Sequence, residues 1–144
     1  MGNSKYDSLK LENQICFPLY AASREIIKQY KPFLDEIDLT YTQYIAMMVL
    51  WEHKTVTVKD LGKHLFLDSG TLTPMLKKME CSGWLCRTRS KEDERVVIVS
   101  ITERGEELHD KIAEVPVKMA KCVKLENEEA MQLYTLLNKM MKTF

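Results

Sequence analysis

The sequence has no hydrophobic run long enough to cross a membrane. Its longest apolar run, Tyr44–Trp51, has eight residues, whereas a membrane-spanning helix needs about 20. The first residues are polar and of mixed charge, without the apolar core of a signal peptide. These absences argue against a membrane protein and an exported protein, so we expect a cytoplasmic location.

Metal-binding and disulfide patterns are missing as well. The 144 residues include four cysteines and three histidines, with no CxxC pair and no suitably placed histidine, so we expect no metal and no cofactor. A chain of this length can bury a core and fold as one domain without a disulfide or a structural metal. In the cytosol the four cysteines are expected to be thiols.

The sequence also lacks an excess of charge of either sign, but its charges are unevenly placed. The net charge is zero, yet residues 77–91 contain five basic residues against one acidic residue, Glu80. The basic residues are Lys77, Lys78, Arg87, Arg89 and Lys91. A basic stretch on a neutral protein can be a footprint for DNA, although a solvated charged face is the more usual outcome.

Apolar residues at helical spacing predict a first helix over about residues 11–31. Pro18 lies inside this pattern, where it removes a hydrogen bond, so we expect either a kink there or a true helix start near Phe17. Pro32 disfavours a helical residue before it and is expected to end the helix.

Capping signals predict three further helices. Thr40 and Gln43 match a capping box at the start of one helix, and Thr57 with Asp60 repeats this pattern at the start of the next. Asp68 is placed to cap a third helix, which Gly83 is expected to end. The expected ranges are about 41–53, 58–66 and 69–82.

The period of the pattern changes after residue 84. "LCRTR" and "VVIVSI" are β-rich runs separated by "SKEDER", which predicts a hairpin with a charged tip. Thr102 is expected to cap a helix that ends near Cys122 and bends at Pro116, and a last helix carries an apolar stripe from Ala130 to Phe144. The order predicts a mainly α fold with a small β-hairpin, a winged helix-turn-helix inside long flanking helices.

The flanking helices carry more apolar surface than one small winged domain needs. We therefore expect a homodimer interface, with packing inside one subunit as the alternative. A single domain over 1–144 would then comprise dimerisation helices at about 8–35 and 103–144 and a DNA-binding region at about 36–102. Such a dimer reads two half-sites about 34 Å apart, so the expected partner is double-stranded DNA with a near-palindromic operator.

The second helix of a helix-turn-helix enters the major groove with its N-terminal residues leading. Here the leading side chains are Ser69, Thr71 and Thr73, whose hydroxyls can bond base edges or phosphates. Lys77 and Lys78 follow and are expected to meet the DNA backbone.

The hairpin carries Arg87, Arg89 and, past its tip, Arg95. An arginine at this place can enter the minor groove, where the negative potential is strongest, and Asp93 is placed to hold Arg95. The alternative is that these charges only solvate a surface. The ordered combination of short helix, turn, second helix and basic wing favours DNA binding.

Two stretches resemble a known family. "LDSGTLTPMLKKME" followed by "RTRSKEDER" resembles the recognition helix and wing of the MarR family. The opening "LENQICFPLYAASRE" and the later "QYKPFLDEIDLTYTQY" resemble the organic-hydroperoxide sensors of that family, the OhrR-like repressors and their staphylococcal virulence-regulator relatives. The likeness covers about residues 11–102.

The resemblance implies functional residues. Cys16 falls on the peroxide-sensing thiol, and Tyr30 and Tyr41 fall on the two tyrosines that hydrogen-bond its thiolate. Organic hydroperoxide is then the oxidant signal. The positions implied to contact DNA are Asp68, Ser69, Thr71, Arg87 and Arg95.

Helix geometry limits how these residues can meet. Cys16 and Tyr30 are fourteen residues apart, about 21 Å on a continuous helix at 1.5 Å per residue. They can meet only across a two-fold axis, or if Pro18 folds the chain sharply back. Tyr20, at i+4, is the neighbour of Cys16 within one chain.

The chemistry requires a thiolate, which two phenol donors stabilise. Oxidation gives a sulfenic acid, which no longer fits the phenols and can bias the dimer away from its operator. Some members of the family close an intersubunit disulfide, which makes Cys122 a candidate resolving thiol. An ordinary helix cysteine is the alternative for that residue.

Three functions remain open on the sequence alone. The leading one is a DNA-binding repressor that releases its operator when Cys16 is oxidised, with activation in place of repression as the alternative. The second is a MarR-type regulator that binds a small apolar or aromatic effector, with Cys16 structural. The third is a thiol peroxidase, in which the basic wing and recognition helix would have no purpose, so we predict that the protein is not an enzyme.

Overall fold

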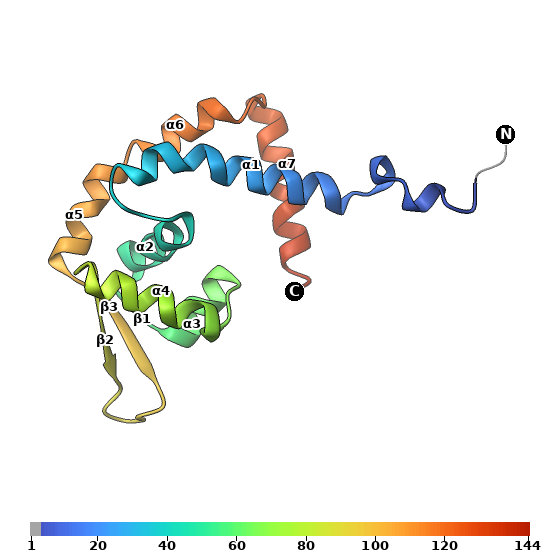
Figure 1. Ribbon diagram of the computed structural model, residues 1–144. Helices are drawn as coiled ribbons and strands as arrows, with labels where there is room; N and C mark the ends of the chain where they lie inside the picture. The colour runs from blue at the N-terminus through green and yellow to red at the C-terminus, as the bar shows by residue number, and fades with distance from the viewer. Residues whose placement is uncertain (1–3) are drawn as a thin grey trace.

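The computed structural model describes residues 4–144, which form a mainly helical fold with one small β-sheet (Figure 1). Two short 3-10 turns, Asp7–Leu9 and Leu11–Asn13, come before the helices. The helices are α1 (Cys16–Asp35), α2 (Tyr41–His53), α3 (Val58–Leu65), α4 (Ser69–Cys81), α5 (Glu103–Ile112), α6 (Val115–Cys122) and α7 (Asn127–Met141). The strands are β1 (Thr55–Thr57), β2 (Leu85–Arg89) and β3 (Val97–Ile101). None of the described helices is long and apolar enough to cross a bilayer.

Helix α1 begins at Cys16, so the predicted start near residue 11 is wrong and the alternative start near Phe17 is correct to within one residue. Pro18 is the third residue of the helix. The first N–H groups of a helix have no partner within it, so proline at this position removes no hydrogen bond. The thiol of Cys16 therefore stands at the first residue of a long helix.

The predicted end of this helix at Pro32 is also wrong, because α1 continues to Asp35. The proline ring removes the hydrogen bond to the carbonyl of Lys28. The turn that follows compensates, since Leu34 is only 2% exposed in the core and Phe33 packs against it.

The predicted helix caps are confirmed. The N–H of Gln43 donates to the Thr40 hydroxyl over 3.3 Å, and the Gln43 carboxamide oxygen accepts from the N–H of Thr40 over 3.0 Å. Gly83, with φ at 81°, follows the last turn of α4 in the left-handed conformation expected of a C-terminal glycine. The capping side chains of α2, α3 and α4 are Thr40, Thr57 and Asp68.

The sheet is antiparallel with the order β1-β3-β2, so the predicted hairpin β2–β3 gains a third strand. Val99 in the central strand pairs with Val56 on one side and with Arg87 on the other. Strand β1 has only three residues, too few to show the alternation by which a strand is predicted.

The core lies between α2, α3, α4, the sheet and α5. Its fully buried side chains include Met47, Leu50, Leu61, Leu72 and Leu76. The indole N–H of Trp51 donates to the carbonyl of Gly105 over 2.9 Å, which fixes the start of α5 against α2. The helix-turn-helix and the strands of the wing thus share one core.

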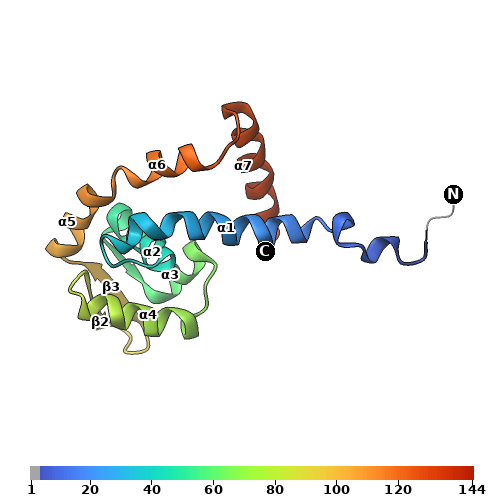
Figure 2. The ribbon, with the colours of Figure 1, turned by 45° about the horizontal axis from the view of Figure 1, so that its top comes forward.

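The predicted helix from Thr102 to Cys122 is divided into α5 and α6. Pro116 is the second residue of α6, where a missing N–H again removes no hydrogen bond. A break before Pro116 is therefore more favourable than the expected bend within one helix. Helix α6 runs beside α1, as Figures 1 and 2 show.

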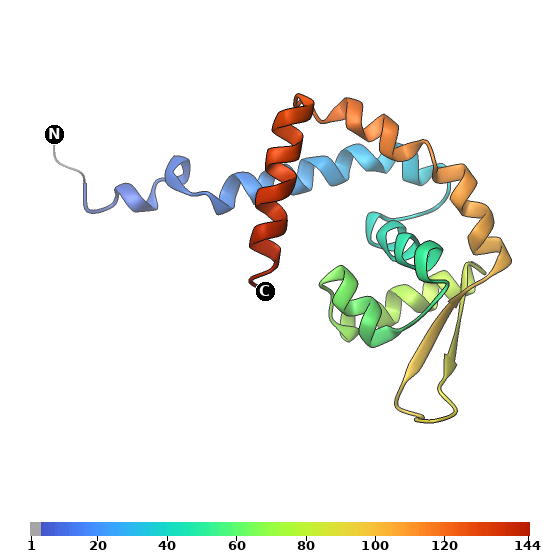
Figure 3. The ribbon, with the colours of Figure 1, turned by 180° about the vertical axis from the view of Figure 1, so that it is seen from behind.

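Helix α7 contributes nothing to this core. It contains no buried residue, and it turns away from α6 (Figure 3). The N-terminal segment projects beyond the first residue of α1. The exposed apolar side chains on α1 and α7 include Phe17, Tyr20, Ile26, Ile27, Met131, Leu133, Tyr134, Leu136 and Met140. These faces have the character of an interface, and the homodimer stays a prediction.

Candidate functional site

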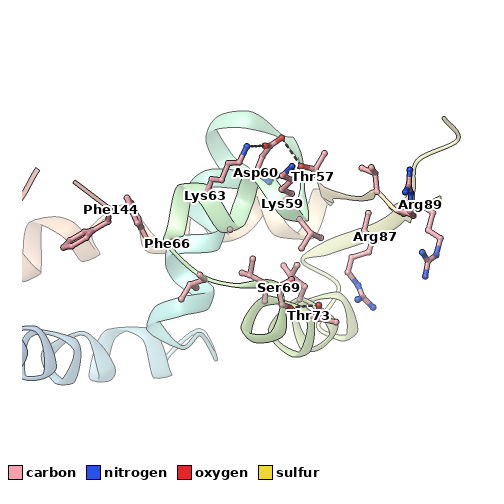
Figure 4. Close-up of a pocket in the computed structure, with 18 residues that line it drawn as sticks. Thr57, Lys59, Asp60, Lys63, Phe66, Ser69, Thr73, Arg87, Arg89 and Phe144 are labelled. Atoms are coloured by element: carbon pink, nitrogen blue, oxygen red, sulfur yellow. Dashed lines mark hydrogen bonds and ion pairs between the residues drawn. The ribbon is translucent and has the colours of Figure 1, made fainter. Parts of the chain in front are cut away.

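An open groove of about 1170 Å³ lies between α3, the start of α4 and the wing (Figure 4). Its floor is apolar, with Leu72 and Leu76 beneath it. Of the described residues that line the groove, Asp60 alone is acidic, and it pairs with Lys63 at 3.6 Å. The cationic lining residues are Lys59, Lys63, Arg87, Arg89 and Arg95. A cationic groove beside a helix start is suited to a polyanion.

Asp68 stands at the start of α4, but its carboxylate serves the helix. It accepts from the N–H of Thr71 over 2.8 Å and from the Thr71 hydroxyl over 3.3 Å. The Thr71 backbone hydrogen bond lowers the pKa of Asp68. The Thr73 hydroxyl donates to the Ser69 carbonyl over 2.8 Å and keeps its lone pairs free. The three exposed hydroxyl residues thus lie together at the helix start.

Arg87 is bound to the recognition helix instead of pointing freely outward. Its Nε and Nη2 donate to Glu80 Oε2 over 3.1 and 3.0 Å, and its backbone N–H donates to Glu80 Oε1 over 2.9 Å. The backbone bond from Arg87, followed by the guanidinium bonds, lowers the pKa of Glu80. This pair ties β2 to α4 and sets the angle between helix and wing.

The sequence does not predict the pairing of Arg87 with Glu80, which stands out there only as the one acid in a basic stretch. The signal was the Gly83 turn, which brings the last turn of the helix back beside the first residues of β2.

Arg95 is an exposed cation of the wing, with its side chain 91% exposed. Its Nε donates to Asp93 Oδ1 over 3.1 Å, and the hydrogen bonds from Arg95 lower the pKa of Asp93. The predicted contact between Asp93 and Arg95 is thus confirmed. Arg89 donates to the Glu94 carbonyl at the hairpin tip over 2.8 Å. Lys77 and Lys78 are exposed on α4.

Cys16 lies exposed at the first residue of α1, whereas the groove lies between α3, α4 and the wing. Ile15 before it provides no side-chain cap, so the first N–H groups of the helix are left uncapped. The positive end of the helix dipole at this position favours an anion such as a thiolate. Within residues 4–144, no hydrogen bond reaches the thiol.

Tyr20 does not turn toward Cys16 in this chain. Its hydroxyl accepts from Arg24 Nη1 over 2.8 Å, and the guanidinium carbon lies 5.3 Å from the centre of the tyrosine ring. The sequence placed Tyr20 beside the thiol from its i+4 spacing, whereas Arg24, at the next i+4 position, holds the hydroxyl.

Tyr30 and Tyr41 are brought together by α1 and α2, with ring centres 5.0 Å apart. Burial raises the pKa of both phenols. Tyr30 lies fourteen residues after Cys16 on the same helix, about 21 Å along its axis, so one chain alone does not bring the pair of Tyr30 and Tyr41 to the thiol. A third tyrosine, Tyr44, lies 5.6 Å from Tyr30 and 6.1 Å from Tyr41 between ring centres.

The other cysteines are spread over the fold. Cys122 is the last residue of α6, half-buried, with its thiol directed at the Lys118 carbonyl over 3.5 Å. Cys81 and Cys86 are exposed at the end of α4 and in β2. The part of the chain that the structure describes contains no group of three or more His, Cys, Asp or Glu side chains arranged for a metal ion.

Comparisons with known proteins match the winged helix-turn-helix and the helices that flank it. The family model of the transcriptional regulators SarA and Rot matches residues 28–112, from α1 to the end of α5. The organic hydroperoxide resistance transcriptional regulator of Bacillus subtilis is 51% identical over 140 residues, which is 97% of this chain and 95% of that protein. The HTH-type transcriptional regulator SarZ of Staphylococcus aureus is 44% identical over 120 residues, 83% of this chain and 81% of SarZ.

Solved structures show the same likeness. Reduced AbfR bound to DNA has a TM-score of 0.82 at 34% identity, and the match covers 97% of this chain and 96% of that one. AbfR is a protein of Staphylococcus epidermidis. A disulfide-formed AbfR also matches, with a TM-score of 0.69 over 96% of this chain and 95% of that one.

Proposed function

Because this chain belongs to the SarA/Rot family of MarR-like winged helix-turn-helix transcriptional regulators, we propose that it releases its DNA operator when Cys16 is oxidised. The family consists of DNA-binding regulators, so the prediction of a regulator and not an enzyme is confirmed. Because a regulator of this kind acts on DNA, we propose a cytoplasmic location. Its relatives include a regulator of organic hydroperoxide resistance, and we propose organic hydroperoxide as the oxidant here.

One observation carries the redox proposal. Cys16 stands exposed at an uncapped helix start, while Tyr30, about 21 Å along the same helix, is packed against Tyr41 of α2. Neither Cys16 nor the pair of tyrosines is a sensor alone. A second copy that packs antiparallel along α1 brings the tyrosines of one subunit to the thiol of the other.

The exposed faces of α1 and α7 support such a dimer. Burial of apolar side chains gives about 25 cal/mol per Å², and these helices leave many such side chains in water. With the flanking helices paired, the two winged regions point the same way, as reading two half-sites of an operator requires.

The proposed reaction is a two-electron oxidation of the thiolate. The Cys16 sulfur attacks the terminal oxygen of the hydroperoxide, the S–O bond forms, and the O–O bond breaks. The alkoxide leaves and takes a proton from water, so the products are a sulfenic acid and an alcohol. The neutral sulfenic acid loses the charge-assisted hydrogen bonds of the phenols, and a dimer stabilised by them shifts.

Cys122 is our candidate for resolving the sulfenic acid. Its thiol would attack the oxidised Cys16 of the partner, form a disulfide and release water. AbfR, a structural relative, is known in a disulfide form. Cys122 lies at the end of α6, which runs beside α1.

For DNA binding we propose the helix start and the wing together. Ser69, Thr71 and Thr73 face the major groove, and Arg95 reaches the minor groove from the hairpin. Lys77, Lys78 and Arg89 meet phosphates. The other three residues act indirectly. Asp68 caps α4, Arg87 joins β2 to α4 through Glu80, and Asp93 holds Arg95.

Arg95→Ala is expected to weaken operator binding by the reduced protein about ten- to a hundredfold and to lower the slope of affinity against salt by about 1. The side chain is 91% exposed and is held only by Asp93, so the fold is unaffected. Arg104→Ala, an exposed arginine of α5 outside the groove, is the matched control. Equal affinities of both variants and wild type would show that the wing does not contact DNA.

The function is tested by operator binding before and after oxidation. A near-palindromic operator is selected from random DNA with the reduced protein, and gel shifts compare wild type with Cys16→Ser, with and without stoichiometric cumene hydroperoxide. Wild type is expected to lose the shift and regain it with dithiothreitol, whereas Cys16→Ser stays bound. On non-reducing gels, a dimer-sized band that disappears in Cys122→Ser identifies the resolving thiol. If oxidised wild type stays bound, the thiol sensor is wrong.

A further inference from the structure

We propose that Phe66, at the turn between α3 and α4, is a specificity-determining residue that contacts the methyl group of a thymine in the major groove of the operator. This inference deepens the DNA-binding part of the proposed function and rests on it, but it does not depend on the oxidation of Cys16. It adds an apolar contact to the hydroxyl groups and cations that the sequence predicts at the DNA.

The backbone at Phe66 adopts the left-handed conformation, with φ at 55° and ψ at 39°. The turn imposes this conformation, because the N–H groups of Phe66 and Leu67 both donate to the carbonyl of Gly62. Such positions at the end of a helix are usually occupied by glycine or asparagine, and a bulky aromatic residue is unfavourable there. The shape of the turn therefore does not explain a phenylalanine.

Packing into the core does not explain this residue either. The neighbours in sequence, Leu65 and Leu67, pack against the buried core, whereas Phe66 does not belong to that cluster and is 56% exposed. Residues held in unfavourable backbone conformations gather at sites that bind a ligand. A contact outside this chain therefore explains the exposed ring best.

The place of Phe66 in the fold indicates what that contact is. Phe66 lines the cationic groove together with Lys63 and Ser69, and it stands three residues before Ser69, the first residue of α4. Figure 4 shows it at one end of the groove, with the labelled arginines of β2 at the other. DNA that takes the start of α4 into its major groove thus passes beside this ring.

The chemistry of the ring selects one group on the DNA. A phenyl group carries no donor or charge for a phosphate, so it adds nothing to the attraction between the groove and the DNA backbone. The apolar group in the major groove is the C5 methyl of thymine, and phenylalanine is among the side chains that contact it. Because this methyl distinguishes thymine from the other bases, the contact selects a sequence, whereas Lys63 beside it holds the backbone.

The test compares operator binding by the reduced full chain in wild type and Phe66→Asn. In the operator selected with the reduced protein, each thymine of both half-sites is replaced in turn by deoxyuridine, which removes only the methyl group. Wild type is expected to lose about fourfold in affinity at one position of each half-site, the effect of one buried methyl group. Phe66→Asn is expected to bind the unmodified operator about tenfold more weakly and to be insensitive to the methyl at that position.

Further measurements separate a base contact from other roles. Phe66→Asn should keep the wild-type slope of affinity against salt, whereas Lys63→Ala should lower that slope by about 1, because only the lysine meets a phosphate. The urea midpoint of Phe66→Asn should equal or exceed that of wild type, since asparagine is tolerated in the left-handed conformation. Met48→Ala, which removes an exposed apolar side chain of α2 outside the groove, is the control and should bind like wild type.

If deoxyuridine has the same effect on both proteins at every position, Phe66 contacts no thymine methyl and the inference is wrong. Phe144 lies at the same end of the groove (Figure 4) and offers the ring a partner within the chain. Phe144→Ala should keep the wild-type operator affinity, and a loss equal to that of Phe66→Asn would instead assign the ring to the end of α7. Failure of wild type to select any near-palindromic operator would refute the proposed function itself.

Discussion

Replacing Tyr30 and Tyr41 together by phenylalanine is expected to slow the oxidation of Cys16 by cumene hydroperoxide about a hundredfold at pH 7. Each phenol that donates to a thiolate contributes about 1.5–3 kcal/mol, and tenfold in rate corresponds to about 1.4 kcal/mol. The phenyl rings remain, so the packing between α1 and α2 is kept. What is lost is the stabilisation of the anion that reacts.

The rate is measured as disappearance of the Cys16 thiol by mass spectrometry after mixing with hydroperoxide. Reduced operator binding serves as the control for folding, since the tyrosines lie far from the groove between α3, α4 and the wing. An oxidation rate within threefold of wild type would show that these tyrosines do not serve Cys16.

Gly105→Ala is expected to lower the free energy of unfolding by about 3–5 kcal/mol, a large part of what a domain of this size has. A Cβ at this position would lie 2.1 Å from the Trp84 carbonyl oxygen and 2.8 Å from Ile101 Cγ1. The backbone there cannot move easily, because the Gly105 carbonyl accepts from Trp51 and its N–H donates to Thr102 Oγ1 over 3.1 Å. The change would push the start of α5 off the core.

The measurement is urea denaturation, and Gly70→Ala is the matched control. At Gly70, a Cβ meets only the Asp68 carboxylate oxygen at 3.0 Å, on the exposed first turn of α4. That variant is expected to stay within about 1 kcal/mol of wild type, since alanine is the better helix former. Similar unfolding midpoints for both variants would show that α5 is not fixed by this contact.

Local signals in the sequence were sufficient where a local force decides the structure. The caps at Thr40, Thr57 and Asp68 and the turn at Gly83 each depend on atoms within a few residues, so their helices were predicted correctly. The mainly α fold with a winged helix-turn-helix followed from their order.

Elements fixed by distant contacts could not be predicted in this way. Strand β1 exists because β3 pairs with it, and α1 continues through Pro32 because the next turn packs into the core. In each case tertiary packing overrides a local preference.

The candidate site likewise contains residues that local sequence predicts and contacts that only the folded chain shows. The residue types at Cys16, Ser69 and Arg95 were evident from their neighbours in sequence. The pairing of Arg87 with Glu80 and the packing of Tyr44 against Tyr30 required the folded chain, because each pair joins residues from two elements. The contact between Cys16 and the tyrosines requires a second chain as well.

The central claim is that Cys16 of one subunit contacts Tyr30 and Tyr41 of its partner, and mixed dimers test it most directly. Two differently tagged chains are purified as heterodimers, and oxidation of Cys16 by cumene hydroperoxide is measured in each. In the first dimer, one subunit carries Cys16→Ser and the other carries Tyr30→Phe with Tyr41→Phe. In the second dimer, one subunit carries all three changes and the other is wild type.

Each dimer has one Cys16, and the two differ only in which subunit supplies the intact tyrosines. The account predicts the wild-type rate in the first dimer, where the thiol faces the tyrosines of the partner, and about a hundredfold slower oxidation in the second. The opposite order, with slow oxidation in the first dimer and the wild-type rate in the second, would place the whole sensor within one chain and contradict the account.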